Sequence, residues 1–254
     1  MKARRLGAAV AVELRKAAAS RVPLATAALV TLGTAALVTS LSLAADAGNQ
    51  QVLAQLGDLA GAHGWARTTG VAAQIVSAGG ALALGIVLSW LVGREFADRT
   101  VGALFALPVP RASTALAKLV VHAAFTVGLA VATPAALAVV GLAIGDGVPD
   151  AGAWQDLGRL AALILLTGAV VVPAGWVATL GRGLLSGVAA TIGIVVVAQV
   201  AVVAGTGAWF PFAAPALWAM GMTTAVAPLG VTLAVAAVFA ALTMRSWRRL
   251  QLDR

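Results

Sequence analysis

Six apolar runs, each long enough to cross a lipid bilayer as an α-helix, constrain the fold of this chain more than any other feature. They occupy residues 22–45, 70–92, 119–145, 159–180, 184–204 and 223–244. About 20 apolar residues suffice to span the hydrocarbon core, where a chain must pair all its own backbone groups. The pattern predicts an all-α polytopic membrane protein, with six transmembrane helices forming a single domain over residues 1–254.

Composition agrees with this fold and excludes several classes of protein. Apolar residues make up 61% of the chain, charged residues 10%, and mean hydropathy is +0.99. Soluble domains carry about 25% charged residues. A net charge of +8 would suggest nucleic acid in a soluble chain. Here the basic residues lie at the ends of apolar runs, so we expect a lipid bilayer and no nucleic acid. With no cysteine, disulfides and cysteine nucleophiles are excluded.

The distribution of basic residues predicts the orientation. If both termini are cytoplasmic, the inner segments are residues 1–21, 93–118, 181–183 and 245–254. They hold six, four, one and four of the 17 Lys and Arg residues, which leaves only Arg67 and Arg159 outside. Cytoplasmic loops of membrane proteins carry such an excess of positive charge. We therefore expect a multi-pass protein of the plasma membrane with both termini in the cytoplasm.

The N-terminal segment, residues 1–21, is basic and amphipathic. Leu6, Val10 and Leu14 recur at helical spacing between its charges. A signal peptide is the alternative, but the apolar run that follows is longer than a signal peptide requires. The pattern predicts an interfacial helix on the cytoplasmic side, followed by a retained membrane anchor.

A charged segment between the second and third runs, residues 93–118, is the most distinctive part of the chain. As a helix it would pair Arg94 with Asp98 and Glu95 with Arg99 at i,i+4 spacing. An apolar stripe follows on the same helix, made of Ala97, Val101, Leu104 and Phe105. Proline at position 108 would end the helix. The pattern indicates a short surface helix that offers one face to a partner; the alternative is a solvated loop whose charges only set topology.

Several chemistries lack their sequence motifs. HExxH, GxSxG and GxxxxGK[ST] are all absent, so we expect no catalytic residue, no metal site and no nucleotide held by a P-loop. His63 and His122, each isolated in sequence, favour interfacial or packed roles. No ionisable residue lies in the middle of a span, where ion-driven carriers place such groups. If the protein transports, its energy comes from elsewhere.

Two features inside or near the spans have two interpretations each. Polar residues within spans are either hydrogen-bonding links between helices or the walls of a substrate path, and the candidates for such a path are Gln74, Ser77, Thr167 and Gln199. The uncharged aromatic segment 205–222 is either a belt at the outer interface or a pair of half-helices that dip back into the membrane.

The charged segment resembles that of ABC-2 type transporter permeases. The matching residues are Gly93-Arg94-Glu95-Phe96, Arg99-Thr100, Leu104, Leu107-Pro108-Val109-Pro110-Arg111 and Ala117-Lys118. Arg99 stands where the family commonly has glycine, a difference that should matter little on a solvated helix. The six spans, the amphipathic N-terminal helix and the basic C-terminal tail fit the same family.

The resemblance implies a transport subunit that pairs with a second permease, identical or related, above two cytoplasmic ATPase subunits that hold ATP and magnesium. The helix at about residues 94–107 would be the coupling helix, with Phe96 or Phe105 as an anchor. The residues expected to couple to the ATPase are Arg94, Glu95, Phe96, Arg99, Thr100, Leu104, Phe105 and Arg111. The resemblance also favours a re-entrant hairpin at 205–222.

The function expected on this basis is outward movement of a hydrophobic or amphiphilic substrate, such as a drug, lipid or peptide-like molecule. This chain would have no cofactor and no enzyme activity of its own. One alternative is a membrane scaffold or assembly protein that binds a cytoplasmic partner through the 94–107 helix and moves nothing. An intramembrane enzyme is a third interpretation, for which the sequence shows no nucleophile–base or metal pattern.

Overall fold

The computed structural model describes residues 2–106 and 109–251, without the side chains of residues 2–4 and 105. These ranges are helical and contain no strand, and six of their helices are long and apolar enough to cross a membrane. The predicted fold class is confirmed. Helices form because each apolar run can satisfy its backbone hydrogen bonds internally.

The six spans are built from nine helical elements. They are α2 (Arg21–Ala28), η1 (Leu29–Gly33) and α3 (Thr34–Asp46); α5 (Trp65–Ala97); α7 (Arg111–Ile144); α8 (Ala151–Val170) and α9 (Val172–Leu180); α10 (Leu184–Val203); and α12 (Ala227–Arg248). The shorter elements are α1 (Lys2–Ala18), α4 (Gln50–Leu56), η2 (Gly57–Gly61), α6 (Val101–Phe105), η3 (Gly207–Trp209) and α11 (Ala214–Ala219). Each predicted run overlaps one span, and α5 and α7 extend beyond their runs into charged sequence.

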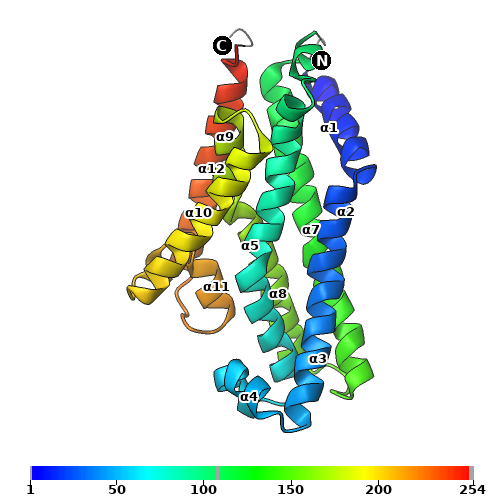
Figure 1. The fold of residues 1–254 in the computed structure, drawn as a ribbon, viewed down its shortest axis with the longest axis vertical. Helices are drawn as coiled ribbons and strands as arrows, with labels where there is room; N and C mark the ends of the chain where they lie inside the picture. The colour runs from blue at the N-terminus through cyan, green and yellow to red at the C-terminus, as the bar shows by residue number, and fades with distance from the viewer. Residues whose placement is uncertain (1, 107–108, 252–254) are drawn as a thin grey trace.

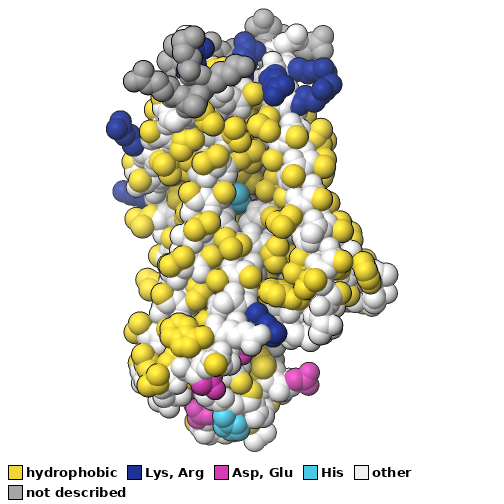
Figure 2. Space-filling model, turned by 180° about the vertical axis from the view of Figure 1, so that it is seen from behind, with side chains coloured by type: hydrophobic (Ala, Val, Ile, Leu, Met, Phe, Trp, Pro, Cys, Tyr) yellow, Lys and Arg dark blue, Asp and Glu magenta, His cyan; other side chains and the backbone are white. Residues whose placement is uncertain are grey.

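The helices run roughly along the long axis of the molecule. Figure 1 shows α1 and the last turns of α12 at one end, which we call the termini end, and α4 at the opposite end, the loop end. Basic side chains gather toward the termini end and acidic ones at the loop end, with apolar surface between them (Figure 2). An apolar outer surface is expected where lipid replaces water.

Helix α5 lies at the centre and contacts α7, α8, α9 and α10. Its approach to α10 depends on small residues one turn apart. A side chain added at Gly93 would meet the backbone of Leu184, and one added at Gly187 would meet Ser89. Small residues at such spacing let helix backbones come close in membranes. Gly93 and Gly187 therefore lie where the close approach of α5 and α10 leaves no room for a side chain.

Proline and glycine shape two of the spans. The fourth span breaks at Val171, two residues before Pro173, which lacks the N–H that would continue the helix. The third span continues as one helix through Pro134. The chain then reverses at Gly181–Gly183, with Arg182 in a left-handed conformation (φ 50°). The reversal expected at this turn is present.

The aromatic segment 205–222 forms η3 and α11. Figure 1 shows α11 beside α8, part of the way along the molecule and not at the loop end. It contacts α8, α12 and α5, and Ala214 and Leu217 are buried. Thr232 of α12 donates a hydrogen bond to the carbonyl of Pro211 (2.6 Å). The segment is thus held against the helix bundle.

Candidate functional site

The connection between α5 and α7 differs from the single helix predicted over 94–107. Helix α5 continues through Ala97, the chain turns at residues 98–100, and α6 begins at Val101. Leu107 and Pro108 lie outside the described residues. The prediction of one continuous helix is wrong because the chain leaves helical geometry at Arg99.

A Schellman-type turn ends α5. The backbone N–H of Thr100 donates to the carbonyl of Glu95 (2.9 Å), and that of Arg99 donates to the carbonyl of Phe96 (3.3 Å). This pattern places one residue in the left-handed region, and here it is Arg99, with φ of 56°. Glycine is favoured at that position because it has no Cβ. The departure from the family at Arg99 therefore bears on backbone strain, contrary to the expectation that it would matter little.

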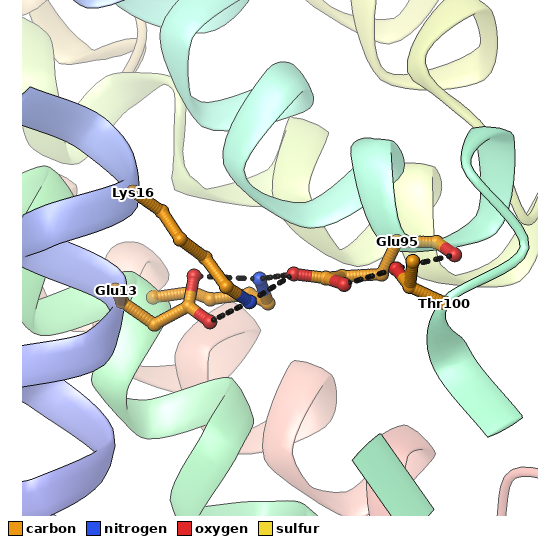
Figure 3. Close-up of polar contacts among 5 residues, drawn as sticks. Glu13, Lys16, Glu95 and Thr100 are labelled. Carbon is orange, nitrogen blue, oxygen red and sulfur yellow. Dashed lines mark hydrogen bonds and ion pairs between the residues drawn. The ribbon is translucent and has the colours of Figure 1, made fainter. Parts of the chain in front are cut away.

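Neither predicted i,i+4 pair is among the ion pairs of the described residues. Instead, Glu95 belongs to a group of four charged side chains, Glu13, Lys16, Glu95 and Lys118, which we call the charge cluster. Lys118 Nζ lies 2.8 Å from Glu13 Oε2 and 3.0 Å from Glu95 Oε1. Lys16 Nζ lies 3.0 Å from Glu13 Oε1 and 2.9 Å from Glu95 Oε1. Figure 3 shows Lys16 reaching between the carboxylates of Glu13 and Glu95.

The charge cluster is neutral and almost wholly removed from solvent. Lys118 is fully buried, and Glu13 and Glu95 are each 2% exposed. Charges at such depth are tolerated only when they are paired and hydrogen-bonded. Thr100 adds a further bond by donating its hydroxyl proton to Glu95 Oε2. The cluster is therefore a single unit in which every member depends on the others.

Lys16 is the one partly exposed member, with 27% of its side chain accessible. Burial alone would lower the pKa of its ammonium group, but the hydrogen bond to Glu95 and the charge of Glu13 raise the pKa above its ordinary value. Lys16 consequently stays charged at neutral pH and the cluster keeps its balance.

The charge cluster joins elements that are far apart in sequence. Glu13 and Lys16 come from α1, Glu95 from the end of α5 and Lys118 from the second turn of α7. Thr100 extends the network to the turn between α5 and α6. Hydrogen bonds and ion pairs thus connect that turn to α1 and to two spans.

Two further residues expected to face a partner lie against the protein itself. The Arg94 guanidinium lies over the ring of Trp90, 4.5 Å from its centroid. The ring of Phe96 meets the buried ring of Trp247 edge-on, with centroids 6.0 Å apart. Arg94 and Phe96 are half-buried, and together with Glu95 they hold the end of α5 against the protein.

Other expected coupling residues do lie near the surface. Arg99 and Thr100 are exposed, Leu104 is half-buried, and the side chain of Phe105 lies outside the described residues. Arg111 is exposed and donates a hydrogen bond to the carbonyl of Leu250 (2.6 Å), which links α7 to the chain after α12. The exposed positions between α5 and the described end of this connection, which we call the turn surface, are Ala97, Asp98, Arg99, Thr100, Gly102, Ala103 and Ala106.

The four residues considered for a substrate path are dispersed. Gln74 is exposed and lines a cavity of about 540 Å³ near the loop end, and Ser77 is half-buried on α5. Thr167 is buried and donates to the carbonyl of Leu163 in its own helix. Gln199 is exposed on α10. No hydrogen bond joins any two of these four residues, and the buried hydroxyl of Ser77 has no hydrogen-bond partner among the described residues.

Sequence reasoning missed Glu13, Lys16 and Lys118 as members of one site. The available signals were Glu13 as the single acidic residue in a basic helix and Lys118 at the close of the family pattern. Neither signal shows which helices meet. Among the described residues, no group of three or more His, Asp or Glu side chains is placed to hold a metal ion.

Comparison with known proteins adds one finding. The family model described as ABC-2 family transporter protein matches residues 10–199. That range contains the whole charge cluster and the turn between α5 and α6. No curated protein matches the sequence.

Proposed function

The chain belongs to the ABC-2 family of transporter proteins, and we propose that it is the permease subunit of an ABC exporter driven by a separate cytoplasmic ATPase. Membership in this family implies an ABC transporter with a partner ATPase. The chain contributes the membrane-spanning part, and ATP with magnesium belongs to the partner. The proposed cargo is hydrophobic or amphiphilic, because the spans are apolar and lack interior charge away from their ends.

The observation that carries this proposal is the charge cluster beneath the α5–α7 connection. An ATPase that presses on this connection needs a rigid path to the spans. The cluster supplies that path, because Glu95 and Lys118 lock the two spans to α1 at distances of 3.0 Å or less. Rigid-body movement of packed helices between two states is a common form of such transmission.

We place the contact with the ATPase on the turn surface. Gly102 and Ala103 are small and exposed, so another protein can approach the backbone closely there. Asp98 and Arg99 offer one charge of each sign for partner choice. In this arrangement Glu95 and Phe96 position the contact without touching the partner.

Orientation and assembly complete the proposal. Positive charge at the termini end supports a cytoplasmic location for that end in the plasma membrane.

The position of α11 beside α8 supports a re-entrant hairpin at 205–222 that closes the outer end of a path. A second permease, identical or related, would complete the transporter. The short segments at the loop end leave no room for a cargo-binding domain, which favours export.

The proposal is tested by joining the protein with its partner ATPase in vesicles and measuring ATP hydrolysis and outward movement of a fluorescent lipid. We expect Ala103→Trp on the turn surface to weaken association and reduce both activities roughly tenfold. Ala47→Trp, a matched change at an exposed position of the loop end, is the control and should leave both unchanged. Equal association of both variants with the ATPase would place the contact elsewhere.

The scaffold alternative uses the same surface and is separated by the transport measurement. A scaffold would bind the ATPase through the turn surface, yet the vesicles would show no lipid movement and no stimulation of ATP hydrolysis. That outcome would refute the proposed transport function but would still support binding of the ATPase through the turn surface.

A further inference from the structure

A cavity of about 320 Å³ lies between α7, α8, α9 and α12, away from the residues of the charge cluster and the turn surface. Its lining is almost entirely apolar, with Ala237 and Ala240 of α12 on one side and His122 and Thr126 of α7 on another. Ligand pockets in proteins begin at about 300 Å³. The space is sufficient for a small amphiphile or for part of a longer chain.

His122 lines this cavity and has one ring nitrogen without a hydrogen-bond partner among the described residues. The side chain is 3% exposed, and its Nε2 lies 3.0 Å from the carbonyl oxygen of Gly168. A carbonyl oxygen only accepts, so the proton is on Nε2 and the neutral ring keeps a lone pair on Nδ1. Among the described residues Nδ1 has no hydrogen-bond partner. A buried polar atom without a partner is uncommon and calls for an explanation.

Like His122, Thr126 can only accept a hydrogen bond from a ligand. Its hydroxyl donates to the carbonyl of His122 (2.9 Å), so only its oxygen lone pairs remain for a ligand. The cavity thus offers two acceptors and no charged side chain. A charged molecule would find no counter-charge, and a molecule with only acceptors would find no donor. The lining selects an uncharged molecule that brings its own donor.

The depth of the cavity indicates where that molecule comes from. His122 lies three residues after the first residue of the apolar run 119–145, or roughly 5 Å along the helix axis. All lining residues of the cavity lie within the apolar runs 119–145, 159–180 and 223–244, so the ligand arrives from the lipid phase. We propose that the cavity binds a neutral lipid alcohol, whose hydroxyl donates to His122 Nδ1 and whose chain lies along Ala237 and Ala240.

Photolabelling of the full chain in nanodiscs tests this site without any ATPase. The probes are a diazirine-bearing long-chain alcohol and its methyl ether, which has the same chain but no donor. We expect the alcohol to label the cavity lining roughly fivefold more than the ether, the effect of one net hydrogen bond. Equal labelling by the two probes, or labelling spread evenly over all lipid-facing helices, would overturn the proposal.

Two alanines provide matched variants. Ala237→Phe fills the cavity from an exposed position and should abolish alcohol-specific labelling, whereas Ala124→Phe, exposed on α7 outside the lining, should preserve it. Labelling that survives Ala237→Phe would contradict the site.

Nuclear magnetic resonance gives a second readout, because the chain contains only two histidines. In ¹⁵N-histidine-labelled protein, the alcohol should shift the Nδ1 signal of His122 and leave His63 unchanged. The methyl ether should shift neither, and an ether-induced shift equal to that of the alcohol would refute hydrogen bonding at Nδ1.

Discussion

The two ends of the molecule hold their helices together with buried polar groups of different kinds. At the termini end, the charge cluster relies on two acids and two lysines that face one another. At the loop end, Arg67 is 4% exposed and binds mainly backbone: its Nε donates to the carbonyl of Ala62 (2.6 Å) and its Nη1 to that of Ser42 (3.4 Å). Its single carboxylate partner, Asp46, has 61% of its side chain exposed.

This difference shows how each end responds to the loss of one charge. Asp46 can be hydrated when Arg67 is removed, and Arg67 keeps its carbonyl partners when Asp46 is neutralised. No member of the charge cluster except Lys16 has access to water. The termini end should therefore be the less tolerant of substitution.

The two ends also differ in which residue types have a positive φ. At the loop end, the residues with positive φ are all glycines, among them Gly57, Gly64 and Gly145. At the termini end they are Arg99 and Arg182. The termini end thus carries positive charge at two positions where the left-handed backbone favours glycine.

Lys118→Met should have the largest effect on stability. It leaves two buried carboxylates with only Lys16 between them, and breaking such a group costs about 3–5 kcal/mol. The free energy of unfolding, measured by denaturant titration in detergent, should fall by this amount. A loss below about 1 kcal/mol would mean that water reaches the cluster, and the contrast between the two ends would fail.

A compensating change should recover part of that loss. Adding Glu13→Gln to Lys118→Met removes one of the two carboxylates, so the double variant should be more stable than Lys118→Met alone. The expected coupling in a double-mutant cycle is about 1–3 kcal/mol. Additive losses would show that Glu13 and Lys118 act independently.

Asp46→Asn at the loop end should cost less than about 1 kcal/mol, because Asp46 is largely exposed and Arg67 retains two backbone acceptors. The same denaturant titration measures it, with Glu13→Gln as the counterpart at the termini end. A loss equal to that of Glu13→Gln would erase the distinction between the ends.

Arg99→Gly should stabilise the protein by about 0.5 kcal/mol. The gain from relieving a left-handed side chain, about 1–2 kcal/mol, is partly offset by the greater chain entropy of glycine. Arg99→Val, with a branched Cβ, should instead destabilise. The changes in the free energy of unfolding should therefore have opposite signs in the two variants. A loss of stability in Arg99→Gly would show that contacts of the Arg99 side chain contribute more than its left-handed conformation costs.

The smallest effect concerns pH. Since folding raises the pKa of Lys16 above 10.5, its contribution is fully present below pH 10.5 and is lost as pH rises through the folded-state value. Stability should therefore decline more steeply above pH 10.5 in the native protein than in Lys16→Met. Parallel declines in the two proteins would place the alkaline transition at other groups.

Some of the site was predictable from local pattern, and some was not. The segment around Glu95 and Arg99 was identified because charge and proline interrupt an apolar sequence there. The expected Glu95–Arg99 pair was wrong, since i,i+4 spacing brings side chains together only while the helix continues, and the chain turns at Arg99. The partners of Glu95 lie on other helices, at sequence separations that no local spacing encodes.

The sequence by itself determined the six spans, the shared end of the two termini and the concentration of positive charge there, because hydropathy and charge act residue by residue on the choice between lipid and water. Only the tertiary structure decided that Glu13 and Lys118, 105 positions apart, form a 2.8 Å ion pair. It also decided that His122 lines a cavity and that its Nδ1 has no hydrogen-bond partner among the described residues. Both depend on which helices pack together, and that choice is made by the shapes of all the contacting side chains at once.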